Sequence, residues 1–371
     1  MSQEGLKLTT YFGERSRVKG VLLADELLDI HARHEIHSSI LLRGVQGFGA
    51  KHRLRSDRLL TLSEDLPLVC VAVDGREQIE RLLADVSSIS YEGLMTLERA
   101  RLYDGARESK QEIAPDEIER SLIAGTVIAR RQDAHDQDPA RAAKLTIYLG
   151  RHERIDGSPA FTAVCRALYE SGVAGATVLL GVDGTRDGAR ERARFFARNQ
   201  NVPLMVISVG DQNRISEAIG RLEQIFDKPL LTLERVRVCK RDGVLLERPH
   251  DESSSSEYGM AVRQKLTVVI SEAAVHERRS VYVELVRRLR AVNAAGATSM
   301  RGIWGFHGDH APHGDRLIST RRHVPIVTET IDTPERIAAL FPIVDELTRE
   351  RGLVTSELVP ASSALHSAPG L

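Results

Sequence analysis

The chain has 371 residues, of which 42% are hydrophobic, 28% charged and only 4% aromatic. These values are typical of a folded protein with aliphatic cores, long enough for two or three domains. The formal net charge is −1, so no overall basic field points to nucleic acid. No apolar run reaches the roughly 18 residues of a membrane span, and the first residues lack the features of a signal peptide. We therefore expect a cytoplasmic protein without direct membrane insertion.

Three segments that open with Lys-Leu-Thr divide the chain into repeats, namely KLTTYF from Lys7, KLTIYL from Lys144 and KLTVVI from Lys265. A glycine-containing phrase follows each of them, and its first glycine lies 37 residues after the lysine in all three copies. The three phrases are RGVQGFG, LGVDGTR and RGIWGFH. A proline 59 or 60 residues after each lysine starts another run of β character. Markers in such constant register predict three copies of one structural unit.

Each copy has the same order of predicted elements. An alternating strand comes first, and a helix follows with an apolar stripe, such as Leu23, Leu27 and Ile30 in the first copy. A second strand leads into the glycine phrase, and a polar segment separates it from the strand that starts at the proline. A second helix and a closing strand complete the order β-α-β-β-α-β, which is ferredoxin-like. The sheet face without helices must be buried, so we predict an α+β fold in which three copies form a single-chain pseudo-trimer.

The predicted boundaries follow from these markers and from the composition of the segments between them. Polar and Ser-rich segments read as linkers, and the last residues read as a disordered tail. In chain order the parts are repeat 1 (1–101), a linker with a helix (102–141), repeat 2 (142–241), a flexible linker (242–262), repeat 3 (263–360) and the tail (361–371).

The first copy resembles the PII-like family known as domain of unknown function 190, through the combination KLTTYFGERSRVKG, RGVQGFGAKHRLRSDRLLTLSEDLPLVCVAVD and GLMTLE. The other copies resemble it more loosely. In repeat 2, Leu180 replaces the arginine at the start of the glycine phrase. In repeat 3, SEAAVHERR from Ser271 replaces the Gly-Glu-x-x-Arg segment that follows the first strand of repeat 1. The resemblance implies a trimer of ferredoxin-like units with a long T-loop after the second strand. It also implies ligands, usually adenine nucleotides in the nitrogen-regulatory branch, in the clefts between units.

The glycine phrases and the basic residues after them are the candidate ligand-binding groups. Glycine permits positive φ and a close approach of the backbone to a ligand, and successive N–H groups in such a turn can bind an anion. The alternative is a tight turn with solvated basic residues. The phrase is not a Walker P-loop, because GAKH follows where Gly-Lys-Ser/Thr is needed. The candidates are Gly44, Gly47, Gly49, Lys51, His52, Arg53, Arg55 and Arg58, then Gly181, Gly184 and Arg194, and then Gly302, Gly305 and Arg316.

No serine elbow, HExxH motif or Walker motif is present in the sequence, so we expect no catalytic residues and no required cofactor. The favoured interpretation is a non-enzymatic regulator. A small anionic ligand, an adenine nucleotide by the resemblance, would bind between repeats and reorder a T-loop-like segment. That segment would contact a protein partner, for example a membrane transporter or channel, and no nucleic acid.

A His-rich segment in repeat 3 supports an alternative function. His307, His310 and His313 lie three residues apart beside two aspartates, and such groups can bind zinc or a similar divalent metal. The protein would then be a metal-binding or structural adaptor. The competing interpretation is a loop that is merely rich in histidine.

The three predicted clefts differ in charge. Repeat 2 has Asp183 and Asp187 where an anion would lie, and repeat 3 has Trp304 and Phe306, which could stack on a base, followed by two more aspartates. We therefore predict fewer than three strong sites, with the tightest at the basic segment of repeat 1.

Two further expectations concern histidine and cysteine. His31, His34 and His37 surround a predicted helix end and are expected to be surface groups. Cys70 falls in a core strand and is expected to be a buried, inert thiol.

Overall fold

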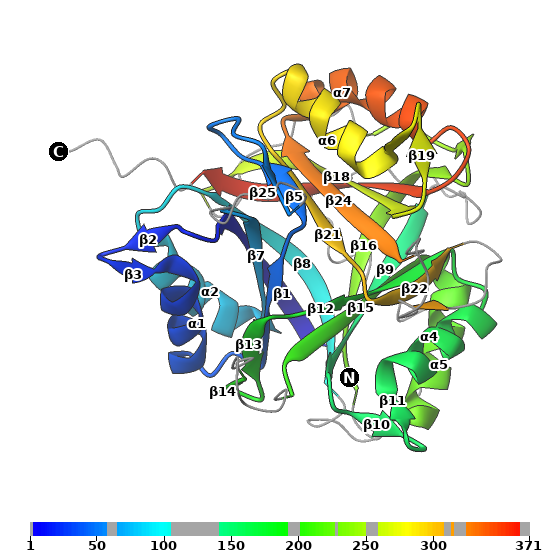
Figure 1. Ribbon diagram of the computed structural model, residues 1–371. Helices are drawn as coiled ribbons and strands as arrows, with labels where there is room; N and C mark the ends of the chain where they lie inside the picture. Colours follow the sequence, from blue (N-terminus) through cyan, green and yellow to red (C-terminus); the bar gives the residue numbers. More distant parts are fainter. Residues whose placement is uncertain are drawn as a thin grey trace.

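The computed structural model describes residues 3–57, 65–104, 141–191, 201–226, 229–249, 259–307, 313–314 and 324–363. These residues form three repeated units, seen in Figure 1 as a blue, a green and a yellow-to-red lobe, with helices outside and strands toward the centre. Among the described residues, no helix is long and apolar enough to cross a membrane.

The first unit contains the expected order of strands and helices. Its main elements are β1 (Gln3–Gly13), α1 (Leu23–Arg33), β4 (Ser38–Arg43), β7 (Pro67–Gly75), α2 (Arg76–Ser87) and β8 (Leu94–Asp104). The sheet order is β4-β7-β1-β8, and every neighbouring pair is antiparallel. The unit also contains four short strands: β2 (Arg17–Val18), β3 (Val21–Leu22), β5 (Gln46–Phe48) and β6 (Arg55–Ser56).

The other two units repeat this arrangement. The second has β9 (Arg141–Gly150), β10 (Arg154–Ile155), β11 (Ser158–Pro159), α4 (Ala160–Glu170), β12 (Gly175–Leu180), β13 (Asp183–Arg186), β14 (Ala189–Arg190), β15 (Pro203–Gly210), α5 (Gln212–Ile225), β16 (Leu230–Arg241) and β17 (Val244–Leu245). The third has β18 (Ala261–Ser271), β19 (Val275–His276), β20 (Arg279–Ser280), α6 (Val281–Ala291), β21 (Ala297–Arg301), β22 (Trp304–His307), β23 (His313–Gly314), β24 (Pro325–Asp332), α7 (Pro334–Leu347) and β25 (Leu353–Ser363). The sheet orders are β12-β15-β9-β16 and β21-β24-β18-β25.

Each unit has its own apolar core between its sheet and its two helices. In the first unit, Leu23 and Leu27 of α1 are fully buried together with Leu6 of β1. A further cluster lies where the three sheets meet, and it contains side chains from all three units: Ile40, Leu42, Val69, Val71, Val73, Leu102, Tyr148, Leu179, Met205, Leu230, Met300 and Val327. The sheet faces that carry no helices are therefore buried against one another, because an apolar sheet face must pack against another element.

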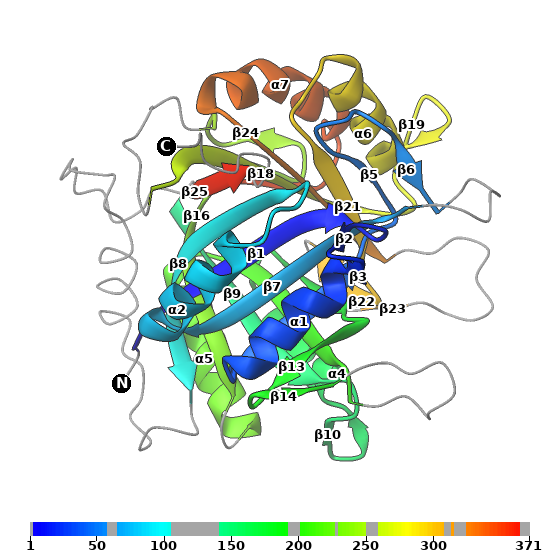
Figure 2. The ribbon, with the colours of Figure 1, turned by 90° about the vertical axis from the view of Figure 1, so that its left-hand side faces the viewer.

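Strand pairing joins the three units in cyclic order. The strand formed by the glycine phrase pairs with the second main strand of another unit: β13 with β4, β22 with β12 and β5 with β21. The closing strands also pair with one another, β8 with β16, β16 with β25 and β25 with β8. Figure 2, turned by 90°, shows β8, β16 and β25 following one another along one side of the molecule. Each unit thus contacts both others in equivalent ways.

Some predicted boundaries need correction because these pairings lengthen the strands. Strand β8 runs to Asp104, and β25 runs to Ser363, so residues 361–363 belong to a strand and not to a tail. Ala361 pairs with Thr96 of the first unit, which supplies the backbone partners that a tail lacks. Strands β17 and β18 likewise reach into the predicted linker 242–262. The helix predicted within 102–141 lies outside the described residues.

Candidate functional site

The glycines of the repeated phrase lie where one repeat pairs with another. A Cβ on Gly47 would lie 2.5 Å from the carbonyl oxygen of Ala297, and one on Gly184 or Gly305 would collide with backbone of the neighbouring repeat. Gly44, Gly181 and Gly302 are packed closely against the proline that starts the next main strand. Of the seven predicted glycines, only Gly305 has a positive φ. Close packing therefore explains six of these glycines, three against backbone of another repeat and three mainly against the proline of their own repeat, whereas the seventh, Gly49, has open space around it.

This difference predicts opposite effects for two neighbouring substitutions. Gly47→Ala forces a methyl group against the backbone of β21 and is expected to cost about 1–3 kcal/mol, as overpacking typically does. Gly49→Ala meets no atom within 4 Å and is expected to cost less than about 0.5 kcal/mol. Urea unfolding followed by circular dichroism measures both. Equal costs for the two variants would contradict the packing explanation.

A cleft of about 660 Å³ lies between repeats 1 and 3. Repeat 1 contributes the end of β1 and the segment after β5, and repeat 3 contributes parts of β18, β21, β24 and β25. The volume is within the range of small-molecule sites. Four of the predicted ligand-binding residues line this cleft: Gly49, Lys51, Arg53 and Arg55.

The basic groups of the cleft differ in how they are engaged. Lys51 forms an ion pair with Glu92 at 2.5 Å, and Arg55 forms one with Asp65 at 2.7 Å. Arg53 is exposed and has no ion-pair partner among the residues that the structure describes. Its guanidinium could therefore bind an anion without breaking an ion pair to any described residue.

The other predicted residues of repeat 1 do not meet in this cleft. Gly44 and Gly47 lie at the strand pair, and the ring of His52 stacks on Phe48 with centroids 5.7 Å apart. The carbonyl oxygen of His52 accepts a hydrogen bond from the Arg290 side chain at 2.5 Å. Three predicted arginines lie outside the described residues: Arg58, Arg194 and Arg316.

The junction between repeats 1 and 2 is occupied by ion pairs. Arg190 binds Asp183 at 2.8 Å and also Asp25 and Asp29 of helix α1, at 2.8 and 2.5 Å. Asp183 is buried, and its carboxylate also accepts a hydrogen bond from the backbone of Gly184. Arg190 is one cation against three carboxylates, so the junction keeps an excess of negative charge, and the expectation that it disfavours an anion stays a prediction.

The described residues do not test the predicted metal site. His307 is half-buried at the end of β22, His310 lies outside the described residues, and nothing is described of the His313 side chain. The metal site of repeat 3 stays a prediction.

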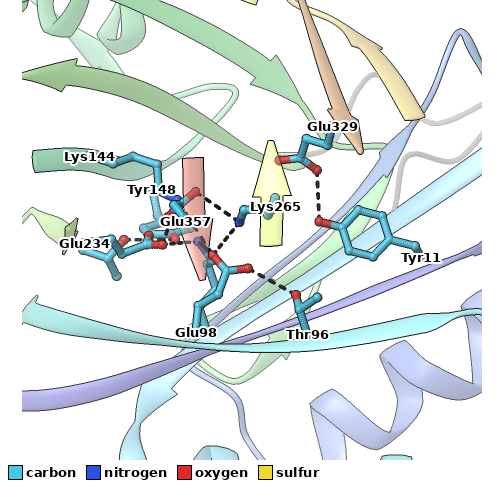
Figure 3. A network of polar contacts seen from close by, with 11 residues as sticks. Tyr11, Thr96, Glu98, Lys144, Tyr148, Glu234, Lys265, Glu329 and Glu357 are labelled. Atoms are coloured by element: carbon cyan, nitrogen blue, oxygen red, sulfur yellow. Dashed lines mark hydrogen bonds and ion pairs between the residues drawn. The ribbon is translucent and has the colours of Figure 1, made fainter. Parts of the chain in front are cut away.

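Six charged side chains meet where the three sheets converge, and the sequence interpretation did not anticipate them. This axial ring consists of Lys7, Lys144, Lys265, Glu98, Glu234 and Glu357, and Figure 3 labels all of them except Lys7. Each residue is at most 8% exposed. The lysines are those of the Lys-Leu-Thr segments, and the glutamates come from the closing strands β8, β16 and β25.

The ion pairs of the axial ring run both within and between repeats. Glu98 contacts Lys7 of its own repeat at 2.6 Å and Lys265 of repeat 3 at 2.7 Å. Glu357 contacts Lys265 at 3.4 Å and Lys144 of repeat 2 at 2.6 Å. Glu234 contacts Lys144 at 2.9 Å and Lys7 of repeat 1. The six groups therefore form a closed cycle that links all three repeats.

Mutual compensation keeps these groups charged in a buried position. Burial raises the pKa of the Glu98 carboxyl, but the ammonium groups of Lys265, Lys7 and Lys144 outweigh this and hold the pKa well below its usual range. Burial lowers the pKa of the Lys265 ammonium group. The surrounding carboxylates raise this pKa by a larger amount, so the net shift is upward. The three carboxylates lie close enough to suggest a metal site, but three ammonium groups already neutralise them.

A sequence signal for the axial ring was present. Residue alternation places Lys7 on the β1 face opposite to Leu6 and Leu8, which is the face without helices. A lysine at the same register in three buried sheet faces requires carboxylate partners, because an unpaired buried charge is costly. A glutamate recurs near the end of each copy, in TLE (96–98), TLE (232–234) and TSE (355–357), and these three glutamates supply the carboxylate partners.

Comparison with known proteins identifies the family. The model of the DUF190 family, described as uncharacterized ACR, matches residues 5–102, 142–238 and 263–361. The chain thus belongs to the DUF190 family and contains three tandem copies of its domain. Among solved structures, the chain is similar to an aspartate kinase from Synechocystis with 9% identity and a TM-score of 0.24. That alignment covers 96% of this chain but only 44% of the kinase, and a likeness this weak carries no argument.

Proposed function

We propose that this protein is a cytoplasmic, non-enzymatic regulator in which three PII-like, ferredoxin-like units form a pseudo-trimer within one chain. The cyclic strand pairing and the axial ring support this arrangement, because each unit contacts its neighbours in equivalent ways. The three units would take the positions of the three subunits of a PII-like trimer, in which ligands bind between subunits.

The ligand is a small anion, an adenine nucleotide by the family resemblance, bound in the cleft between repeats 1 and 3. The cleft carries this proposal because it has the volume of a small-molecule site and contains Arg53, a cation without a partner among the described residues. Binding would shift the populations of the T-loop-like segment that follows β5. That segment would in turn contact a protein partner such as a membrane transporter or channel.

Isothermal titration calorimetry with ATP, ADP, AMP and cyclic dinucleotides tests this proposal. At least one of them is expected to bind, with fewer than three strong sites per chain, because Arg190 and its aspartates occupy the junction of repeats 1 and 2. Arg53→Ala is expected to weaken binding about 10- to 100-fold, which corresponds to the loss of a charge-assisted hydrogen bond.

Arg81→Ala is the matched control, because Arg81 is an exposed arginine that pairs with Glu77 on helix α2 at 3.0 Å. It is expected to leave affinity unchanged. Absence of binding by every nucleotide at millimolar concentration would contradict the nucleotide proposal, and three equivalent sites would contradict the expected asymmetry.

A further inference from the structure

Repeat 3 has a carboxylate at a position where the other repeats have an aliphatic side chain. Glu329 of β24 lies opposite Thr267 of β18. The equivalent cross-strand pairs are Val71 with Thr9 in repeat 1 and Ile207 with Thr146 in repeat 2. At this position the other two repeats have an apolar side chain, so the pseudo-threefold arrangement does not explain the acidic residue in repeat 3.

Glu329 lies at the boundary between two cavities. It lines the cleft between repeats 1 and 3, and it also lines an axial cavity of about 80 Å³ next to the axial ring. Tyr11 of β1 lines both cavities as well, and its hydroxyl donates a hydrogen bond to Glu329 Oε2 at 3.0 Å (Figure 3). The Tyr11–Glu329 pair thus forms the floor of the cleft, on the side toward the molecular axis.

The Glu329 carboxylate has remaining capacity to accept hydrogen bonds. Within the described part of the chain, Tyr11 is its only hydrogen-bond donor, whereas an ionised carboxylate has about four acceptor sites. The other acids of the cleft are engaged: Glu92 by Lys51, and Asp332 by the backbone N–H groups of Ala295 and Thr333. Burial, followed by the charge of Glu329, raises the pKa of Tyr11, so the tyrosine remains a hydrogen-bond donor near neutral pH.

We propose that Glu329 recognises the amino group of a nucleobase whose phosphate faces Arg53, so that the cleft selects nucleotides with an aminated base. This inference rests on the proposed nucleotide function and adds the group that selects the base. A half-buried carboxylate that loses water on ligand binding needs a donor in its place. A base without an amino group leaves the acceptor sites of the carboxylate that Tyr11 does not occupy desolvated and unpaired, and a site built in this way rejects such a base strongly.

Calorimetry with AMP and purine riboside 5′-monophosphate tests this directly, because the two probes differ only in the 6-amino group. The wild-type protein is expected to bind AMP at least about tenfold more tightly. Glu329→Val introduces the residue type found at Val71, and it is expected to lower AMP affinity to that of the other probe. Purine riboside monophosphate should bind this variant as well as the wild type or better, because a negative charge has been removed.

Glu329→Gln keeps the size of the side chain and tests the same point if the valine variant does not fold. It should retain part of the preference for AMP, because the amide oxygen still accepts a hydrogen bond. Glu92→Gln removes a different acid of the same cleft and should preserve the full preference. Thermal unfolding of each variant confirms that it is folded.

Two results would overturn the inference while leaving nucleotide binding intact. One is equal affinity of the wild-type protein for the two probes. The other is an equal loss of affinity for both probes in Glu329→Val, which would show that Glu329 only maintains the shape of the cleft. If neither probe nor any other nucleotide binds at millimolar concentration, the proposed function fails, and this inference fails with it.

Discussion

Replacement of Glu98 by glutamine is expected to lower the free energy of unfolding by about 3–5 kcal/mol, because it leaves an uncompensated ammonium group in the buried axial ring. Urea unfolding at neutral pH, followed by circular dichroism, measures this loss. The same ion pairs give the expected pH dependence. Because the folded pKa of Glu98 is depressed, its stabilisation is present above the unfolded value near 4.3 and is lost as the pH falls toward the folded pKa.

Two further variants isolate the effect of unbalanced charge. Glu77→Gln breaks an exposed pair with Arg81 and is expected to cost less than about 1 kcal/mol. The double variant Lys7→Met with Glu98→Leu removes one charge of each sign and keeps the ring neutral. It should be more stable than Glu98→Gln alone, since apolar replacements of buried ion pairs are often well tolerated. A double variant less stable than the single one would contradict this account.

The pH dependence of stability is also expected to include a large contribution from His31. Burial, with a smaller contribution from His34, lowers the pKa of His31 to about 3. In the unfolded chain a histidine titrates near 6.5, so below that pH the unfolded state binds a proton that the folded state excludes. Each pH unit between 6.5 and the folded pKa should therefore remove about 1.4 kcal/mol of stability. At pH 5 the loss amounts to about 2 kcal/mol.

His31→Leu should abolish this part of the pH dependence, as measured by urea midpoints between pH 7 and pH 4.5. Leu27→Val is the matched control in the same helix, because it trims a fully buried side chain without changing a titratable group. It should lower stability by a similar amount at every pH. An unchanged slope in His31→Leu would show that His31 is not the group responsible.

The same helix shows where sequence interpretation went wrong. His31 was expected at the surface, yet it is 2% exposed and its Nδ1 lies 4.0 Å from the Cys70 Sγ. The helix continues to Arg33, and His31 lies four residues after Leu27 on the same helix face, so the packing that buries Leu27 also buries His31. The expectation for Cys70 is confirmed, because the thiol is buried and burial raises its pKa to about 12.

The arginine before the glycine phrase gives a second example. Its recurrence in repeats 1 and 3 was visible, but its partner was not. Arg43 donates two hydrogen bonds to Glu14 at 2.9 and 3.0 Å, and Arg301 donates two to Glu272 at 3.1 and 2.9 Å. In each case the glutamate follows the first strand, 29 residues earlier. A sheet brings the two groups together, and their spacing along the chain does not indicate this.

The sequence by itself determined the number of repeats, the order of their elements and the sheet face that had to be buried. These properties depend on local periodicity and on a constant register, which are legible along one chain. Only the tertiary structure decided which groups meet. Lys7 and Glu234 are 227 residues apart, yet they touch in the axial ring because three sheets converge there. Gly47, Gly184 and Gly305 likewise meet backbone of another repeat, and Glu329 reaches the cleft floor only because repeats 1 and 3 are adjacent.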